Sequence, residues 1–241
     1  MDDVCGGSNK HGGQVELSVL IPVYNEEATV AALVLRVLAA PYRKQIVVVD
    51  DGSPDDTPRV LRRFAGIDNL EVHTHARNRG KGAAVRTALA RARGRFTIIQ
   101  DADLEYDPQD YPLLIEVLRR GEARVVYGSR YLDGRNELPV TRFWFGVKLL
   151  NFMVTLLYGA RVTDEATCYK AFDTELLRTL DLRCTGFEFC PEVTAKLLKR
   201  RERIMEVPIR YAYRTVAAGK KIGWSDGVQA FWTLLKYRFI K

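Results

Sequence analysis

Short apolar runs rich in β-branched residues alternate with helix-patterned stretches through the first half of the chain. The apolar runs span residues 17–22, 45–53, 70–73, 96–99 and 123–130, and the helical stretches between them span 26–38, 56–64, 82–92 and 108–119. Near-continuous apolar strands that alternate with helices indicate a mostly parallel sheet with both faces covered. The sequence therefore predicts an α/β fold with a mostly parallel central sheet flanked by helices.

Polar residues directly follow four of these predicted strands. The four clusters lie at residues 22–26, 50–51, 101–103 and 128–130. In open sheets of this kind, ligands bind outside the carboxyl ends of the strands. Because the four clusters should meet at one edge of the sheet, we expect a binding site there rather than four unrelated loops.

The most specific cluster is Asp101-Ala102-Asp103, which comes directly after the run 96–99. On an extended strand end, residues i and i+2 project to the same side, so the two carboxylates should repel each other unless a cation lies between them. Carboxylate oxygens suit Mg²⁺ or Mn²⁺ that holds a diphosphate. The competing interpretation is a solvated acidic loop, because Asp-x-Asp is a common tripeptide.

The net charge of +7 comes from 37 Lys and Arg residues against 30 Asp and Glu residues. The sequence shows no zinc-ligand spacing, helix-turn-helix pattern or RNP-like motif, so we expect no nucleic-acid partner. A phosphorylated substrate or an anionic membrane face accounts for the surplus, and a solvated basic surface is the alternative. The four cysteines lack metal-ligand spacing and follow no secretory signal, which favours reduced thiols in the cytosol. Cys168 and Cys190 are more typical of small core residues than of nucleophiles.

The order and spacing of the motifs resemble an inverting family 2 glycosyltransferase of the GT-A fold. The motifs that carry the resemblance lie at residues 21–26, 49–53, 78–82 and 101–103. Those at 128–130, 163–164, 168–170, 186–188 and 206–209 are similar to the polyprenyl-phosphate hexosyltransferases, of which the dolichol-phosphate mannose synthases are the best-known members. The resemblance implies one GT-A domain over residues 16–241, after a tail at 1–15 that we expect to be disordered. Residues 16–130 would bind the nucleotide sugar, and residues 131–241 would serve the acceptor and the membrane interface.

The resemblance assigns roles in donor binding. Pro22, Tyr24 and Glu26 would frame the base and ribose, with a core tyrosine as the alternative for Tyr24. Asp51 would bind the base or ribose, whereas Asp50 is the candidate that holds the loop. Ala102 would offer its backbone to the nucleoside.

Lys81 is the candidate phosphate ligand. It lies in Gly80-Lys81-Gly82, which is not a Walker P-loop because the upstream glycine and the following Ser or Thr are missing. Glycines at a helix start nevertheless let backbone N–H groups approach an anion. In the family, the stretch 214–223 folds over the donor diphosphate, so the resemblance makes Arg214 and Lys220 candidate ligands of that diphosphate. Lys221 is the alternative to Lys220.

The resemblance makes Asp101 and Asp103 the metal ligands, with Asp103 the better candidate for direct contact. Glu105 stands where the family often has Gln, and it would add a third carboxylate to the metal shell. The expected cofactor is Mg²⁺ or Mn²⁺.

Catalysis is assigned to Asp103, Arg130 and Asp164. A lipid phosphate acceptor is already an anion, so it needs charge neutralisation rather than a base. Arg130 would supply this together with Arg142 or Arg135, and a single displacement would invert the anomeric centre. The first alternative is a soluble glycosyltransferase acting on a small-molecule or saccharide hydroxyl, with Asp164 or Glu165 as base. Asp164 could equally cap a helix or bind the donor's hydroxyls. The second alternative is a non-enzymatic protein that binds nucleotide sugars.

Two stretches, 142–159 and 229–239, have the pattern of amphipathic helices with aromatic residues. The charge and glycine within the first argue against a membrane-spanning helix. Each helix lies in a membrane interface or packs on the core. We expect peripheral association with the cytosolic face of a membrane.

Overall fold

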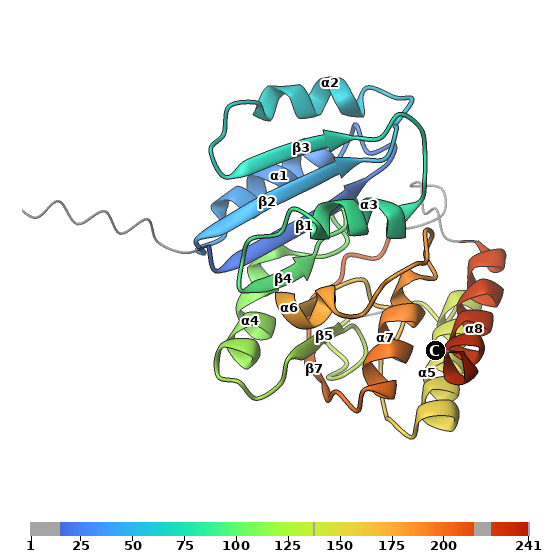
Figure 1. The fold of residues 1–241 in the computed structure, drawn as a ribbon. Helices are drawn as coiled ribbons and strands as arrows, with labels where there is room; N and C mark the ends of the chain where they lie inside the picture. The colour runs from blue at the N-terminus through green and yellow to red at the C-terminus, as the bar shows by residue number, and fades with distance from the viewer. Residues whose placement is uncertain (1–14, 137, 215–222, 241) are drawn as a thin grey trace, which may run out of the picture.

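The computed structural model describes residues 15–136, 138–214 and 223–240. Seven strands within this part form one sheet in the order β3-β2-β1-β4-β6-β5-β7 (Figure 1). The strands are β1 (Leu17–Val23), β2 (Lys44–Asp50), β3 (Leu70–Thr74), β4 (Phe96–Ile99), β5 (Val125–Ser129), β6 (Lys170–Asp173) and β7 (Ile204–Pro208). Every neighbouring pair is parallel except the two that β6 makes with β4 and β5. The prediction of a mostly parallel sheet is confirmed.

Helices cover both faces of this sheet (Figure 1). They are α1 (Val30–Ala39), α2 (Thr57–Leu61), α3 (Lys81–Leu89), α4 (Tyr111–Arg119), α5 (Arg142–Tyr158), α6 (Thr174–Arg178), α7 (Phe189–Lys199) and α8 (Trp224–Phe239), with short 3₁₀ turns at Arg62–Phe64 and Pro108–Asp110. Figure 1 shows α3 in front of the sheet and α1 behind it.

The pattern of burial explains which strands the sequence predicts. Every residue of β1, β2, β4 and β5 is buried. A strand covered on both faces has a continuous run of apolar residues, and for that reason these four strands could be predicted from the sequence. Strand β3 lies at one edge of the sheet, and after the buried Leu70 its residues alternate between partly buried and exposed, which makes its apolar run weaker.

Strands β6 and β7 were not predicted. Strand β6 has four residues and begins with Lys170, whose ammonium group is fully buried and donates to the carbonyls of Glu165 at 2.7 Å and Thr167 at 2.6 Å. In a sequence pattern a lysine usually indicates an exposed position, so a buried lysine that donates to two carbonyls does not look like part of a central strand. Strand β7 forms the other edge and is only partly buried, so it lacks the apolar continuity of the central strands.

A second apolar cluster joins α5, α7 and α8, which pack against one another beside the main sheet. Helix α5 buries Leu150, Met153 and Val154 in this cluster. Its opposite face exposes a stripe of apolar side chains, namely Phe145, Leu149, Phe152 and Leu156. Packing of one face on the neighbouring helices is thus observed, whereas the membrane-interface interpretation of the exposed face stays a prediction. Among the described residues, no helix is long and apolar enough to cross a membrane.

Candidate active site

A cavity of about 370 Å³ lies at the carboxyl ends of the parallel strands. This volume is in the range of pockets that hold small ligands. Most of the residues predicted for the site line it, namely Pro22, Tyr24, Glu26, Asp51, Lys81, Asp101, Ala102, Asp103, Glu105, Arg130 and Arg214. Lys220 and the side chain of Arg142 lie outside the described part of the chain. The edge of the sheet that the sequence predicted is thus where the structure gathers the candidate residues.

The two aspartates after β2 hold loops in place. Asp50 accepts hydrogen bonds from the Ser53 N–H at 3.1 Å and the Ser53 hydroxyl at 2.6 Å, which agrees with its predicted loop-holding role. The Asp51 carboxylate is almost fully buried and accepts from the N–H groups of Arg79 and Gly80, the latter at 2.7 Å. Its other oxygen lies 2.6 Å from His75 Nδ1. Asp51 therefore fixes the glycine-containing turn, so a direct contact with base or ribose would have to exchange these bonds.

That turn begins α3 and requires glycine for a steric reason. Gly80 has φ of 92°, and a Cβ there would lie 2.4 Å from the carbonyl oxygen of Thr185. The same carbonyl accepts the Ala83 N–H at 3.0 Å. The expectation that backbone N–H groups of this turn approach an anion needs correction, because neighbouring protein groups already accept the N–H groups of Gly80 and Ala83. The ammonium group of Lys81 is left as the phosphate candidate.

The acidic pair lies in a turn, not on an extended strand end. Strand β4 ends at Ile99, and the turn that holds Asp101 and Asp103 continues to Leu104 at a φ of 65°. The predicted same-side geometry of a strand is therefore not what brings the two carboxylates together. Asp101 forms an ion pair with Lys81 inside the cavity. Burial lowers the pKa of Lys81, but Asp101 together with the Cys168 and Cys190 thiols outweighs this effect, so the pKa lies well above its usual value.

The surroundings of Asp103 disfavour the charged form of its carboxylate. Burial and the neighbouring carboxylates of Asp101 and Glu105 raise its pKa to about 7, although its carboxylate accepts the Glu105 N–H at 3.0 Å. A bound cation would relieve this repulsion. The described residues hold no group of three or more His, Cys, Asp or Glu side chains that could bind a metal. The predicted three-carboxylate set is therefore not assembled, because Asp101 pairs with Lys81 and the Glu105 carboxylate accepts the Arg214 N–H at 2.9 Å. The oxygen donors of Asp103 and Asp101 fit a hard divalent cation once Lys81 moves aside.

Arg130 and Asp164 form a buried ion pair at the end of β5. Arg130 Nε lies 2.7 Å from Asp164 Oδ2 and Nη2 lies 2.7 Å from Oδ1, while the Arg130 N–H adds a third bond at 3.0 Å. Asp164 is fully buried and does not line the cavity, whereas Arg130 does. Burial lowers the pKa of Arg130, but Asp164 together with Tyr106 and Tyr211 more than offsets this effect and raises the pKa. The geometry makes Asp164 the residue that orients Arg130, because both of its carboxylate oxygens accept hydrogen bonds from Arg130.

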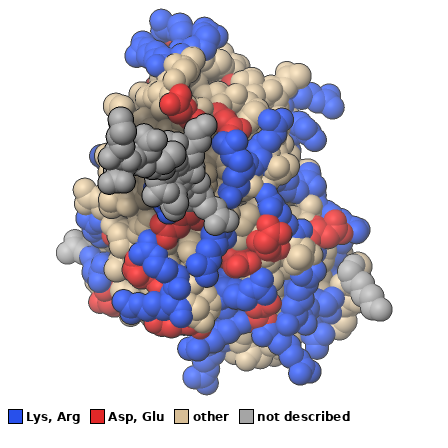
Figure 2. Space-filling model, turned by 60° about the vertical axis from the view of Figure 1, so that its left-hand side comes forward, with Lys and Arg blue, Asp and Glu red and all other residues tan. Residues whose placement is uncertain are grey.

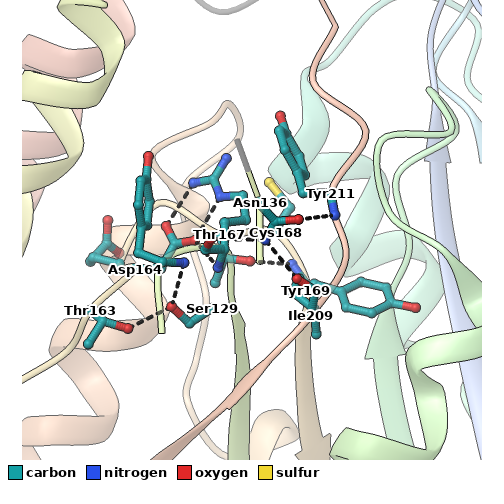
Figure 3. Close-up of polar contacts among 12 residues, drawn as sticks. Ser129, Asn136, Thr163, Asp164, Thr167, Cys168, Tyr169, Ile209 and Tyr211 are labelled. Atoms are coloured by element: carbon teal, nitrogen blue, oxygen red, sulfur yellow. Dashed lines mark hydrogen bonds and ion pairs between the residues drawn. The ribbon is translucent and has the colours of Figure 1, made fainter. Parts of the chain in front are cut away.

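A polar network surrounds this pair (Figure 3). The Asn136 amide donates to the carbonyls of Arg130 at 2.9 Å and Ile209 at 2.8 Å, and it accepts the Tyr211 N–H at 2.9 Å. The ring of Tyr211 lies 5.0 Å from the Arg130 guanidinium. The segment after β7 is thus tied to the segment after β5, which holds Arg130 rigidly at the cavity wall.

Arg214 lines the cavity and contacts two of the loops that build it. Its guanidinium lies 3.1 Å from a carboxylate oxygen of Glu26, which follows β1. Because its backbone is bonded to Glu105, Arg214 connects the loop after β1 with the acidic turn after β4. The predicted contact of Arg214 with the donor diphosphate stays a prediction.

The comparisons with known proteins agree with this geometry. Residues 18–181 match the model for glycosyl transferase family 2. The chain belongs to glycosyltransferase family 2. It is 33% identical over 201 residues to a low-salt glycan biosynthesis hexosyltransferase, Agl6, of Haloferax volcanii, covering 81% of this chain and 47% of the relative. It is 29% identical over 222 residues to the dodecaprenyl-phosphate galacturonate synthase of Rhizobium johnstonii, covering 89% of this chain and 64% of the relative. The chain thus spans about half to two thirds of these relatives' lengths.

A further relative matches over nearly its whole length. The chain is 28% identical over 243 residues to the UDP-N-acetylglucosamine–dolichyl-phosphate N-acetylglucosaminyltransferase of Methanococcus voltae, covering 92% of this chain and 96% of the relative. Among solved structures, the glucosyl-3-phosphoglycerate synthase of Mycobacterium tuberculosis in complex with Mn²⁺, UDP and phosphoglyceric acid has a TM-score of 0.72 at 22% identity, covering 96% of this chain and 81% of that one. At this identity the likeness shows the fold. The described chain has the GT-A arrangement of this family.

Several residues of this glycosyltransferase line the cavity without having been given a role by sequence reasoning. They are Ala84, Tyr106, Ala166, Cys168, Gly186, Phe187 and Tyr211. Cys168 and Phe187 lie in motifs that matched the family, and that match was the available signal. Their positions on the cavity wall depend on the antiparallel insertion of β6 and on the turn before α7.

Proposed function

We propose that this glycosyltransferase moves a hexose from a nucleotide-diphosphate sugar, either GDP-mannose or a UDP-hexose, to a polyprenyl phosphate of the dolichyl type. The observation that supports the proposal is the set of charged residues that line one cavity. The carboxylates of Asp101 and Asp103 and the cations of Lys81, Arg130 and Arg214 all line it. A donor diphosphate and an acceptor phosphate both need such positive groups, and the carboxylates need a cation.

On the donor side, Tyr24, Glu26 and Ala102 line the part of the cavity built by the loops after β1 and β4. We assign the base and ribose to these residues, with Asp51 shaping the turn behind them. Lys81 and Arg214 face the diphosphate, and Lys220 joins them if the stretch 214–223 closes over the donor. Binding of the diphosphate would draw Lys81 away from Asp101 and Arg214 away from Glu26.

A divalent cation, Mg²⁺ or Mn²⁺, would be held by Asp103 with Asp101 and would supply positive charge to the donor diphosphate. Lys81 and Arg214 neutralise the same group from the protein side. The effect of this arrangement is to stabilise the charge that builds on the leaving diphosphate. It also exposes the anomeric carbon to attack from the opposite side, which inverts its configuration.

On the acceptor side, Arg130 is the candidate ligand of the lipid phosphate, and Asp164 holds the Arg130 side chain in place. Arg142 is proposed as a second ligand on the ground of sequence alone. A phosphate monoester, whose second pKa is about 6, is mostly deprotonated near neutral pH, so it attacks without a protein base. The names of the Rhizobium and Methanococcus relatives specify dodecaprenyl-phosphate and dolichyl-phosphate, which supports a polyprenyl phosphate acceptor.

The lipid acceptor fits an apolar surface on α5 and α8. Helix α5 exposes Phe145, Leu149, Phe152 and Leu156, and α8 exposes Val228, Trp232 and Phe239. Exposed apolar stripes on two packed helices are typical of proteins that rest on a membrane. We propose that this surface, the α5–α8 apolar face, seats the enzyme on the cytosolic side of a membrane.

The soluble alternative requires Asp164 or Glu165 to act as base on a hydroxyl acceptor. Both residues are fully buried outside the cavity lining, and both carboxylate oxygens of Asp164 are bonded to Arg130. The geometry therefore favours the lipid phosphate.

The deciding experiment is transfer of radiolabelled hexose from UDP- and GDP-sugars to a short polyprenyl phosphate, read by solvent partition. Parallel reactions should contain soluble saccharide hydroxyls. We expect label in the lipid phase, with Mg²⁺ or Mn²⁺ present. Transfer to a hydroxyl acceptor that is lost in Asp164→Asn, with none to lipid, would establish the soluble alternative.

A further inference from the structure

Lys148 belongs to α5, yet its ammonium group lies against the segment that follows β5. It is 4.5 Å from the centre of the Tyr131 ring and 5.4 Å from the centre of the Trp144 ring. Tyr131 directly follows Arg130, whose guanidinium lies 5.7 Å from the centre of the same tyrosine ring. One aromatic ring therefore connects a lysine of α5 with the arginine that lines the cavity.

The two cations differ in their partners. Arg130 is bonded to both carboxylate oxygens of Asp164. In the described part of the chain, the contacts of the Lys148 ammonium group are with aromatic rings and not with a carboxylate. Lys148 is exposed, and a cation–ring contact at an exposed site is weak. Its ammonium group can therefore turn from the rings to an anion at little cost in free energy.

Lys148 also borders the exposed apolar stripe of α5. Side chains three and four residues apart are neighbours on a helix surface, so Lys148 lies next to Phe145 and Phe152. The stripe continues along the helix for about 16 Å. Its members are Phe145, Leu149, Phe152 and Leu156. A ligand whose negative group lies at Lys148 would thus have a continuous apolar surface beside it.

We propose that Lys148 is a further ligand of the acceptor phosphate, which it binds together with Arg130 while the isoprenoid chain lies along the apolar stripe of α5. The inference rests on the proposed lipid acceptor and names how this chain would hold it. An amphiphile with one terminal phosphate matches two neighbouring cations followed by an apolar stripe. Lys148 forms no covalent bond and transfers no proton. Its charge offsets the negative charge of the phosphate beside the donor diphosphate.

The competing role for an exposed lysine next to an apolar face is contact with anionic lipid headgroups. That role requires the ammonium group to lie outward, at the membrane surface. The ring contacts instead place it against Tyr131, on the side where Arg130 lies. The geometry therefore favours the acceptor over the bulk lipid.

The test compares Lys148→Gln with Lys236→Gln in the full chain. Lys236 is the matched control, because it is an exposed lysine of the neighbouring helix α8 whose ammonium group also lies against a ring, 5.3 Å from the centre of that of Tyr237. Transfer to a short polyprenyl phosphate is measured in neutral detergent micelles, which contain no anionic lipid. We expect Lys148→Gln to raise the KM for the acceptor by roughly tenfold, as loss of a hydrogen bond to a charged group does.

The KM for the donor and the melting temperature of Lys148→Gln should stay at the values of the parent. Lys148→Arg should restore most of the acceptor affinity, because it keeps the charge. Lys236→Gln should behave as the parent in every measurement.

Geranyl phosphate separates the phosphate contact from the chain contact. Lys148→Gln should raise the KM for this short acceptor as well, because the phosphate is unchanged. The double variant Phe152→Ser and Leu156→Ser should raise the KM for the polyprenyl phosphate alone, since the geranyl chain ends before it reaches these residues.

An acceptor KM of Lys148→Gln equal to that of the parent overturns the inference, and weaker flotation of this variant with anionic vesicles would then assign Lys148 to lipid headgroups. An equal rise in KM for Lys148→Gln and Lys236→Gln also overturns it, because the effect would then come from overall charge. A parent that transfers sugar to neither lipid phosphate removes the proposed function and the inference with it, which is a different result from a loss confined to one variant.

Discussion

The Arg130 guanidinium is held by the Asp164 carboxylate through two parallel hydrogen bonds of 2.7 Å each. This geometry gives a planar cation one fixed orientation at the cavity wall. It also uses both carboxylate oxygens of the residue that a hydroxyl-transferring enzyme would need as its base.

Asp164→Asn should lower the stability of the folded protein more than it changes the chemical step of sugar transfer. Removing one charge of a buried ion pair typically costs about 3–5 kcal/mol, and asparagine keeps one of the hydrogen bonds, so we expect the lower end of this range. Transfer should slow because Arg130 is misplaced, but the acidic limb of the pH–rate profile should stay where it is in the parent. Thermal unfolding and kcat across pH measure the two effects. Asp181→Asn, at an exposed ion pair with Arg183, is the matched control and should change neither.

Asp103→Asn should abolish metal-dependent turnover and leave the fold intact or more stable. The stability gain is expected because burial and two neighbouring carboxylates disfavour the charge of Asp103, as its raised pKa of about 7 shows. Donor turnover with Mn²⁺, Mg²⁺ or EDTA, together with the melting temperature, tests this. The exposed Asp68→Asn serves as control. Full activity in EDTA would remove the metal from the proposed function.

Arg214→Ala should raise the KM for the donor by about 10–100-fold, because a hydrogen bond to a charged group contributes roughly 1.5–3 kcal/mol. The melting temperature should change little, since Arg214 lines the cavity and is not part of the core. Lys220→Ala should act in the same direction if the stretch 214–223 closes on the diphosphate. Arg203→Ala, at an exposed position, provides the control. A large loss of stability with a normal KM would make Arg214 structural.

The double variant Phe152→Ser and Leu156→Ser should reduce flotation with anionic vesicles and lower transfer to polyprenyl phosphate. Both side chains are exposed, at 59% and 64%, so the variant should fold normally. Leu35→Ser alters an equally exposed apolar residue on α1 and should leave flotation unchanged. Equal flotation of the parent and the double variant would count against the α5–α8 apolar face as the membrane contact.

Glu165→Gln should reduce the pH dependence of stability. Burial raises the pKa of Glu165 to about 7, against the opposing effect of Lys170. Between its ordinary value of about 4.3 and this value, the folded state binds more protons than the unfolded state, so stability falls as pH rises through this window. The variant should therefore gain stability relative to the parent at pH 8 and lose this advantage at pH 4. Urea unfolding of both proteins at the two pH values measures the difference.

The charges on the face shown in Figure 2 illustrate how little a net charge by itself says about binding partners. Lys and Arg side chains dominate its lower half, with Asp and Glu interspersed. Within the described chain as a whole, some arginines are partnered: Arg119 pairs with Glu16 and Glu116, and Arg124 pairs with Asp173 and Glu202. A net charge counts residues, whereas partner recognition depends on where they lie and what neutralises them.

The sequence by itself determined the first five strands, the helices between them and the edge at which the polar residues gather. These features depend on local periodicity and burial, which a single segment records in its own residues. It also supplied the motifs that place the chain in its family.

Tertiary structure alone decided what each polar residue contacts. Lys81 pairs with Asp101 from another loop, Asp51 bonds the turn before α3, and Asp164 bonds Arg130 across 34 residues of sequence. Strand β6 enters the sheet antiparallel and brings Cys168 to the cavity wall. The physical reason is that hydrogen bonding and charge act over a few ångströms in space. Which groups come that close, and how far burial strengthens their interaction, is fixed only when the strands take their places in the sheet.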